Sequence, residues 1–228
     1  MKIGILQTGH APDALIAETG DYDTFFQKLL ANEGFEYETW NVVDLDFPDG
    51  PHAADGFILT GSRHGAYEDL PFIKPLEQFI RDTYAAKVPM VGICFGHQII
   101  AQAMGGTVVK HPHGWSVGRQ TYKFGDEDIV MNAWHQDQIS VLPDTAQVCG
   151  TSDFCEYAAL VYGNDIFTVQ AHPEFEGSFV KQLAETRGRG VVPDQLLDEA
   201  VAQVGEPVHK DLMARRIGAF FKERNHAS

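Results

Sequence analysis

Over the first hundred residues, short apolar runs alternate with longer segments whose apolar positions recur every three or four residues. A short apolar run that ends at a turn residue is typical of a buried strand, whereas the longer recurrence is typical of an amphipathic helix. Phe72, Phe79 and Ile80, for example, share one face of the helix predicted over 71–86. The predicted strands are 2–7, 35–40, 56–60 and 88–93, and the predicted helices are 23–32, 71–86 and 96–104.

The pattern changes after residue 106, where short β-type runs at 118–124, 129–133, 146–151, 158–162 and 166–171 indicate an antiparallel extension. Three helical segments follow, at 176–186, 194–203 and 210–224. The last of them carries an apolar side formed by Leu212, Ile217, Phe220 and Phe221. Such a face more often covers a sheet than forms a dimer interface.

The order of the predicted elements indicates the fold class. Strands that alternate with helices require right-handed crossovers, which produce a mostly parallel sheet covered on both faces. A length of 228 residues suits one sizeable domain and only weakly permits two. We therefore predict a single α/β domain over residues 1–228, a three-layer α/β/α structure with a small antiparallel extension and a helical C-terminal segment from about residue 176.

Composition narrows the classes of partner. Hydrophobic residues make up 44% and charged residues 21%, as in ordinary globular proteins. A net charge of -15 repels phosphate backbones and argues against nucleic acid. No apolar run reaches the roughly 18 residues of a membrane span, and the N-terminus lacks the features of a signal peptide. Three cysteines are too few, and odd in number, for a disulfide framework, so we expect a cytoplasmic protein without membrane partners.

The first candidate for chemistry is Cys94, which lies between a predicted strand and a predicted helix in Gly92-Ile-Cys94-Phe-Gly96. This spacing has the form of a nucleophile elbow, in which flanking glycines permit a tight turn that projects the central side chain. The helix N-terminus favours a thiolate there, and the N–H of Phe95 is placed to donate to an oxyanion. An ordinary buried cysteine is the alternative interpretation of so short a motif.

A base and an orienting acid follow the last predicted strand, in Gln170-Ala-His172-Pro-Glu174. The carboxylate of Glu174 is able to hold the imidazole of His172 in the tautomer that accepts a proton from a thiol. Taken alone, a His-x-Glu sequence is usually a surface histidine beside an acid. Here both motifs follow strands of one predicted parallel sheet, so they should open on the same carboxyl edge.

Together, Gly92-Ile-Cys-Phe-Gly-His-Gln98 and His172-Pro-Glu174 resemble the signature of the class I glutamine amidotransferases, and the resemblance covers roughly residues 2–174. It implies a flavodoxin-like fold and a Cys-His-Glu triad that cleaves the glutamine side-chain amide through a γ-glutamyl thioester. Carried over to this chain, Cys94 is the nucleophile, His172 the general base and later acid, and Glu174 the orienting carboxylate.

The resemblance also assigns residues around the nucleophile. The family keeps a glycine-rich oxyanion loop, commonly Gly-Gly-Pro, where this chain has Thr60-Gly61-Ser62. Gly61 and the amide of Phe95 are expected to form the oxyanion hole. Trp115 and Trp134 fall where family members line the glutamine pocket, although core packing is the commoner fate of tryptophan. The predicted substrate-binding residues are Gln98, Ser62, Ser116 and His135.

We predict neither a metal nor a cofactor. His111-Pro-His113 lacks the carboxylate or cysteine companions that a zinc site usually shows. No Walker-type loop occurs in the sequence, and no Gly-x-Gly-x-x-Gly follows the first predicted strand.

Among family members, the chain resembles stand-alone proteins similar to γ-glutamyl peptidases and to the glutaminase part of GMP synthetase, since no synthetase domain follows its helical tail. The resemblance implies a cysteine-dependent hydrolase whose small-molecule substrate is glutamine or another γ-glutamyl amide. Two alternatives stay open. One is an ammonia-supplying glutaminase that works as the subunit of a separate synthetase partner and is activated by it, and the other is a non-enzymatic binding protein on the same fold.

Overall fold

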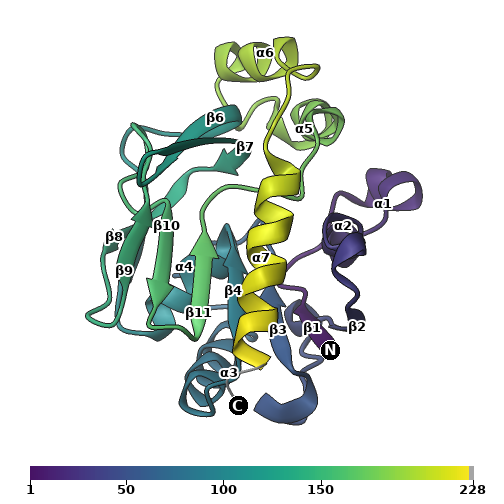
Figure 1. The fold of residues 1–228 in the computed structure, drawn as a ribbon. Coiled ribbons are helices and arrows are strands. Elements are labelled where there is room, and N and C mark those ends of the chain that lie inside the picture. Colours follow the sequence, from purple (N-terminus) through teal and green to yellow (C-terminus); the bar gives the residue numbers. More distant parts are fainter. Residues whose placement is uncertain (226–228) are drawn as a thin grey trace.

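A seven-stranded sheet runs through the centre of the computed structural model, which describes residues 1–225 (Figure 1). The last three residues of the predicted domain, 226–228, lie outside the described part. Five neighbouring strands are parallel and two at one edge are antiparallel, which confirms the predicted α/β class. In spatial order the strands are β2 (Glu36–Trp40), β1 (Lys2–Leu6), β3 (Gly56–Leu59), β4 (Met90–Ile93), β11 (Ile166–Val169), β10 (Ala159–Tyr162) and β9 (Gln147–Gly150).

The segment predicted as an antiparallel extension differs in part from the structure. The run expected at 166–171 forms β11 inside the central sheet, where it pairs parallel with β4, with Ile166 opposite Met90. Two small sheets lie outside the central one, a hairpin of β6 (Ser116–Phe124) with β7 (Glu127–His135) and a pair of β5 (Thr107–Lys110) with β8 (Asp137–Val141). The segments of β5 and β8 were not predicted as separate strands.

Helices cover both faces of the central sheet because its strands are apolar on both sides. On β3, Phe57 and Leu59 pack into one apolar cluster while Ile58 packs into the other, as the alternation of side chains along a strand requires. The first cluster is covered by α3 (Ile73–Ala85) and α4 (Phe95–Ala103). The second is covered by α2 (Tyr22–Leu29) and α7 (Lys210–Asn225) (Figure 1).

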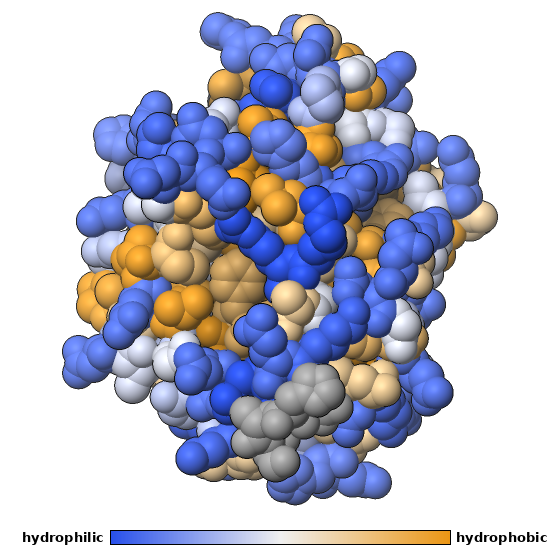
Figure 2. All heavy atoms as spheres, viewed as in Figure 1, coloured by the Kyte–Doolittle hydropathy of each residue, from blue (hydrophilic) through white to orange (hydrophobic). Residues whose placement is uncertain are grey.

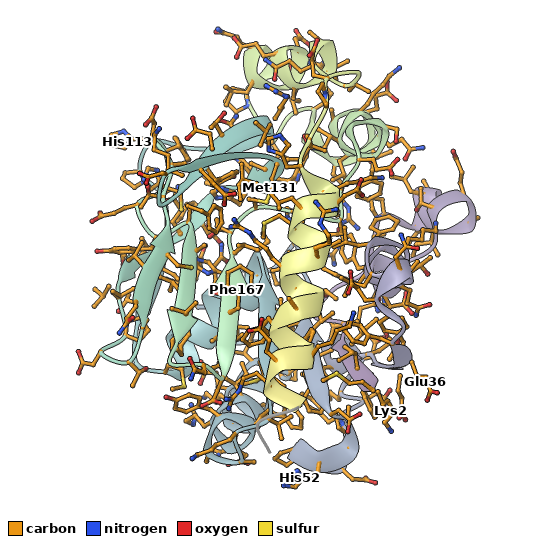
Figure 3. The ribbon with its side chains drawn as sticks, in the orientation of Figure 1. Lys2, Glu36, His52, His113, Met131 and Phe167 are labelled. Carbon is orange, nitrogen blue, oxygen red and sulfur yellow. The ribbon has the colours of Figure 1, made fainter. Side chains whose placement is uncertain are left out.

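The last helix, α7, covers the sheet as its apolar side predicts. Ile217 and Phe221 are fully buried in the second cluster, and a fully buried Phe contributes about 1.5–3 kcal/mol through lost water contact. Phe220 meets Phe167 of β11, which is labelled near the centre of Figure 3, with ring centroids 6.3 Å apart. Met131 of β7 belongs to the same cluster, so the β6–β7 hairpin is packed onto this face as well.

A third apolar cluster joins the N-terminal and C-terminal helices beside the β6–β7 hairpin. Its helices are α1 (Asp13–Thr19), which was not predicted, α5 (Gly177–Leu183), α6 (Asp194–Ala202) and one side of α2 with Tyr22 and Phe25. A π-helical turn, Ala184–Gly188, continues α5, so the segment predicted over 176–186 is helical with a widened last turn. Short 3₁₀ turns complete the structure at Ala31–Glu33, Val42–Asp44 and Pro51–Ala53.

Polar residues cover much of the surface seen in Figure 2, and the apolar residues on this face gather in separate patches. Within residues 1–225, no helix has the length and apolarity that crossing a membrane requires.

Candidate active site

Cys94 occupies a strained turn between β4 and α4. Its φ of 52° and ψ of -101° lie in a region that residues other than Gly rarely adopt, and a backbone held there costs roughly 1–3 kcal/mol of strain. Hydrogen bonds from Cys94 N to Val169 O (2.9 Å) and from Gly96 N to Thr60 O (3.1 Å) hold the turn against the neighbouring strands. The Cys94 side chain therefore projects at the carboxyl edge of the parallel strands.

The two glycines of the elbow are required by close backbone packing. A Cβ at Gly92 would lie 2.6 Å from Gly96 O, and a Cβ at Gly96 would lie 2.3 Å from Leu59 O. Both distances are far below normal contact, and the blocking atoms belong to the backbone. Gly-x-Cys-x-Gly is thus the pattern that lets α4 start directly against β3 and β4.

His172 and Glu174 stand on the segment that follows β11, facing the same edge. The Nδ1 of His172 donates to Oε1 of Glu174 at 2.6 Å, and both side chains are nearly inaccessible, with exposures of 4% and 1%. Phe175 stacks on the imidazole, with centroids 3.9 Å apart and planes 3° from parallel. His172 N also bonds to Asn132 O at 2.8 Å, so the backbone as well as the ring is fixed.

Electrostatics favour a protonated imidazole at this position. Burial lowers the pKa of His172, but the charge of Glu174 and the charge and hydrogen bond of Cys94 together raise the pKa above its ordinary value. The sulfur of Cys94 thus faces a cationic partner within a buried site. The other oxygen of Glu174, Oε2, makes no hydrogen bond to the described residues.

The residues expected to form the oxyanion hole lie beside this pair. A Cβ on Gly61 would come within 2.8 Å of Cε1 of His172 and 3.8 Å of Cβ of Cys94, so Gly61 packs directly against both. The Phe95 amide opens α4 next to Cys94, while the Phe95 ring is buried in the core. The structure brings together both predicted donors, and their role stays a prediction.

The predicted substrate-binding residues are placed differently from one another. Ser62 and His135 line a cavity of about 780 Å³ into which Cys94 and His172 also open. Burial lowers the pKa of His135 to about 3, so this residue is neutral at ordinary pH. Ser116 is paired with His135 across β6 and β7 but is not among the described residues that line the cavity.

Gln98 lines the cavity as well, but its side-chain N–H groups are already used. Its Nε2 donates to Asp137 O at 2.8 Å and to Oε1 of Gln170 at 3.1 Å. Gln170 is fully buried, and its own Nε2 donates to Sγ of Cys94 at 3.6 Å. Gln170 was not singled out from the sequence, although it lies directly after β11 and only two residues before His172.

Charged side chains around the cavity were also missed. Arg63 and Lys110 are exposed and Arg187 is half-buried, and all three line the cavity with the carboxylates of Glu68 and Asp137. A chain with a net charge of -15 thus gathers an excess of cations around this one opening. The three cations come from distant segments, so no local sequence pattern could have grouped them.

The rings of His111 and His113 lie 5.3 Å apart, outside any larger cluster of ligand-type side chains. Throughout the described part of the chain, no three His, Cys, Asp or Glu residues are grouped in a way that could hold a metal ion.

The geometry defines a class of protein, a mostly parallel α/β protein with a cysteine at the elbow beside a His–Glu pair. The family described as "Glutamine amidotransferase class-I" matches residues 21–183, well over half of the chain. This chain therefore belongs to the class I glutamine amidotransferase family, and the family predicted from the sequence is confirmed.

Several curated relatives carry more specific names. A glutamine amidotransferase-like protein of Schizosaccharomyces pombe is 30% identical, covering 97% of this chain and 98% of that protein. Gamma-glutamyl peptidase 3 of Arabidopsis thaliana is 28% identical over 73% of this chain and 74% of its own length. A subunit of the glutamine-hydrolysing GMP synthase of Picrophilus torridus is 33% identical over 59% of this chain and 73% of its own length.

Among solved structures, the glutamine amidotransferase of Methylobacillus flagellatus is similar with a TM-score of 0.75. The similarity covers 98% of this chain and 92% of that one at 21% identity, and it supports the fold alone.

Proposed function

We propose that this chain is a hydrolase of γ-glutamyl amides in which Cys94 is the nucleophile, His172 the proton carrier and Glu174 the carboxylate that orients His172. The observation that carries this proposal is the convergence, at one edge of the sheet, of the elbow cysteine with the buried His172–Glu174 pair, joined at 2.6 Å. A structural cysteine has no need of a strained backbone, a cationic imidazole and an open cavity together.

The first half-reaction forms a thioester. The Cys94 thiolate attacks the γ-carbonyl carbon, a C–S bond forms, and the N–H groups of Phe95 and the Gly61 loop stabilise the resulting oxyanion. When the carbonyl re-forms, the C–N bond breaks and the His172 imidazolium gives its proton to the departing amine or ammonia. The neutral imidazole and the γ-glutamyl thioester remain.

The second half-reaction restores the enzyme. His172 takes a proton from a water molecule while the water oxygen attacks the thioester carbonyl. Collapse of this second oxyanion breaks the C–S bond and releases the γ-carboxylic acid of glutamate, which loses its proton to the solvent, while the thiolate is left facing an imidazolium. Glu174 accepts the hydrogen bond from Nδ1–H in both halves, so Nε2 stays the nitrogen that transfers protons.

The size of the cavity favours substrates larger than glutamine. Pockets of about 300–1,000 Å³ enclose drug-sized ligands, and the cavity of about 780 Å³ lies in the upper half of that range. The similarity to a gamma-glutamyl peptidase points the same way. We therefore expect γ-glutamyl peptides or γ-glutamyl amines to be better substrates than free glutamine.

A comparison of Cys94→Ala with the parent protein tests the proposal directly. Glutamate release is measured from glutamine, from γ-glutamyl dipeptides and from γ-glutamyl alkylamides. The parent should release glutamate from at least one of them, and Cys94→Ala should lose at least about 10³-fold of that rate, because the covalent route is closed. Cys149→Ala, at a half-buried cysteine outside the cavity, is the matched control and should keep the parent rate. Undiminished release by Cys94→Ala would refute the scheme.

A second function is favoured by one relative, the GMP synthase component of Picrophilus torridus. In that case the chain supplies ammonia to a separate synthetase and is slow by itself. A stoichiometric synthetase recovered in a pull-down, together with a glutaminase rate that rises on its addition, would distinguish this function from a free-standing hydrolase.

A further inference from the structure

A chain of two glutamine side chains ends at the sulfur of Cys94. Gln98, in the first turn of α4, donates to the Asp137 carbonyl at 2.8 Å and to Oε1 of Gln170 at 3.1 Å. Gln170 donates in turn to Sγ of Cys94 at 3.6 Å. Gln170 is completely buried and Gln98 is 3% exposed, so these contacts are shielded from water. These hydrogen bonds thus hold the amide of Gln170 against the Cys94 sulfur from the side of the sheet.

The Asp137 carbonyl decides which way both amides point. A backbone carbonyl only accepts hydrogen bonds, so the atom of Gln98 that faces it must be the NH₂ group. The second N–H of that group then points at Gln170, whose facing atom must be its carbonyl oxygen. This leaves the NH₂ of Gln170 towards Cys94. The carbonyl of Asp137, the first residue of β8, therefore determines through Gln98 and Gln170 that an N–H group faces the sulfur.

We propose that Gln170 is a catalytic residue that donates a hydrogen bond to the Cys94 thiolate and so raises the fraction of thiolate available for attack, and that Gln98 is a positioning residue that keeps the Gln170 amide in this orientation. The proposal rests on the proposed function, because it assigns a role in activating the same nucleophile. A donor that meets an anionic acceptor is stronger than one that meets a neutral thiol, so the contact favours the reactive form.

The titratable groups around the sulfur allow the effect to be measured by pH. Burial raises the pKa of Cys155 to about 12 and raises the pKa of Tyr22 and Tyr122 still further, while burial lowers the pKa of His135 to about 3. Between about pH 6 and pH 10, these four groups keep one state. The charged groups that face the sulfur are the pair His172 and Glu174, and the charged or titratable groups that line the same cavity are Arg63, Lys110, Arg187, His64, Glu68 and Asp137.

The test compares the alkylation of Cys94 by iodoacetamide as a function of pH in the parent, Gln170→Met, Gln98→Met and Gln138→Met. Modification is followed on the Cys94 peptide by mass spectrometry. Methionine keeps approximately the size of glutamine and removes the donor. Gln138 is the matched control, because it is a buried glutamine that donates to Phe154 O and not to sulfur.

In Gln170→Met the midpoint of alkylation should move at least about one pH unit upward, a tenfold loss of thiolate at neutral pH, as expected for a hydrogen bond to a charged group. Gln98→Met should shift it less in the same direction, and Gln138→Met should match the parent. A parental pH profile in folded Gln170→Met would overturn the role of Gln170. A parental profile in Gln98→Met alone would overturn the role of Gln98. Since alkylation needs no substrate, failure of the parent to hydrolyse γ-glutamyl compounds would count only against the proposed function.

A measurement on the unsubstituted protein covers the case in which Gln170→Met does not fold. In ¹⁵N-labelled protein, the side-chain amide resonances of Gln170 should move with the same pH midpoint as the alkylation of Cys94. In Cys94→Ala this movement should disappear, although His172 is still present. Resonances that do not respond to pH in the parent, or that respond equally in Cys94→Ala, would overturn the proposal.

Discussion

The absence of a side chain at Gly61 leaves the space that the imidazole of His172 occupies. The ring is held on two other sides, by the carboxylate of Glu174 and by the stacked ring of Phe175, and its backbone is fixed by the bond from His172 N to Asn132 O. On these sides the ring position is determined by close contacts, and the cavity lies on its open side. Small changes at this scale should therefore alter the chemistry before they alter the fold.

Gly61→Ala tests this expectation. The new Cβ would lie 2.8 Å from Cε1 of His172, so the ring or the loop has to shift by several tenths of an ångström. Displacements of about 1 Å are able to cost about 10²-fold in rate, and we expect kcat to fall at least tenfold while the free energy of unfolding changes by less than about 2 kcal/mol. Steady-state kinetics and urea denaturation measure the two quantities.

Gly205→Ala is the control for this substitution. No atom lies within 4 Å of a Cβ at Gly205, so kcat and stability should both stay at the parent values. A Gly61→Ala protein with the parent kcat would show that the His172 ring tolerates displacement. It would also contradict the proposed role of Gly61 in catalysis.

At the level of elements, β11 and the segment after it supply two polar groups that contact the nucleophile, Gln170 and His172. Along β11 and the segment after it, Thr168, Gln170 and His172 alternate with apolar residues, and they contact α4 or Cys94 directly before it. Thr168 Oγ1 hydrogen-bonds Nδ1 of His97 at 2.7 Å, and Gln170 reaches Cys94. The end of β11 and the start of α4, which lie side by side, bring these groups together.

The sequence predicted the elements whose apolar pattern is strong and missed those that depend on contacts elsewhere in the fold. In α1 only Leu15 is buried, and the residue before the helix, Pro12, makes no capping hydrogen bond. In β5 three of four residues are exposed, and the strand exists because it pairs with β8, about thirty residues further along the chain. In neither segment is the local sequence pattern strong enough to distinguish a helix or a strand from a loop.

The same distinction applies to the site. Cys94, His172 and Glu174 were found because each lies in a short motif at the end of a strand, where the backbone decides the direction of the side chain. The orientation of Gln170 depends on Asp137, and the grouping of cations at the cavity depends on three segments that are far apart in the sequence. Such arrangements follow from the packed structure and leave no local pattern in the sequence.

The contribution of α7 to the sheet can be measured through Phe221. Its ring is fully buried and fills the space over Gly56, where a Cβ would meet it at 2.8 Å. Phe221→Ala should lower the free energy of unfolding by about 3–5 kcal/mol, the usual cost of removing a buried aromatic ring. Urea denaturation measures this loss, with Glu223→Ala on the exposed side of the helix as the control. If α7 served mainly as a contact between two copies of the chain, Phe221→Ala would instead change the elution volume in size-exclusion chromatography and leave the stability of the monomer nearly unaltered.

For the whole molecule, two buried histidines limit stability in acid. Burial lowers the pKa of His97 and of His135 to about 3 in the folded protein, below the value of about 6.5 for an unfolded chain. Between these values the unfolded state binds more protons, so the stabilisation is complete above about pH 6.5 and is lost as the pH falls towards 3. Each histidine should contribute up to about 1.4 kcal/mol per pH unit in this window.

Urea denaturation at several values between pH 7 and pH 4 checks this expectation. His97→Asn should show a shallower fall of the unfolding free energy with decreasing pH than the parent. His52→Asn, at an exposed histidine near the lower edge of Figure 3, should show the same slope as the parent. Parallel slopes for all three proteins would mean that other groups, chiefly the 32 acidic residues, account for the acid sensitivity.

The distribution of charge over the whole chain leads to a prediction about substrate choice. Arg63, Lys110 and Arg187 line the cavity of a protein that is otherwise strongly acidic. A leaving amine that carries a carboxylate should therefore be preferred over the same amine with its carboxylate blocked. We expect γ-glutamyl-glycine to have a higher kcat/KM than γ-glutamyl-glycinamide, and this preference should shrink with rising salt, because exposed charges are screened.

Removal of single cations separates this effect from the general field of the protein. Arg63→Gln and Lys110→Gln should each reduce the preference for γ-glutamyl-glycine by roughly two- to fivefold, the range expected for exposed ion pairs, while the rate with the glycinamide changes little. Lys74→Gln removes an exposed cation that does not line the cavity and should leave the preference intact. An equal loss of kcat/KM for both substrates would indicate that the cations bind the glutamyl carboxylate. If the ratio of the two kcat/KM values stayed unchanged in both variants and in high salt, the leaving amine would not lie close to these cations.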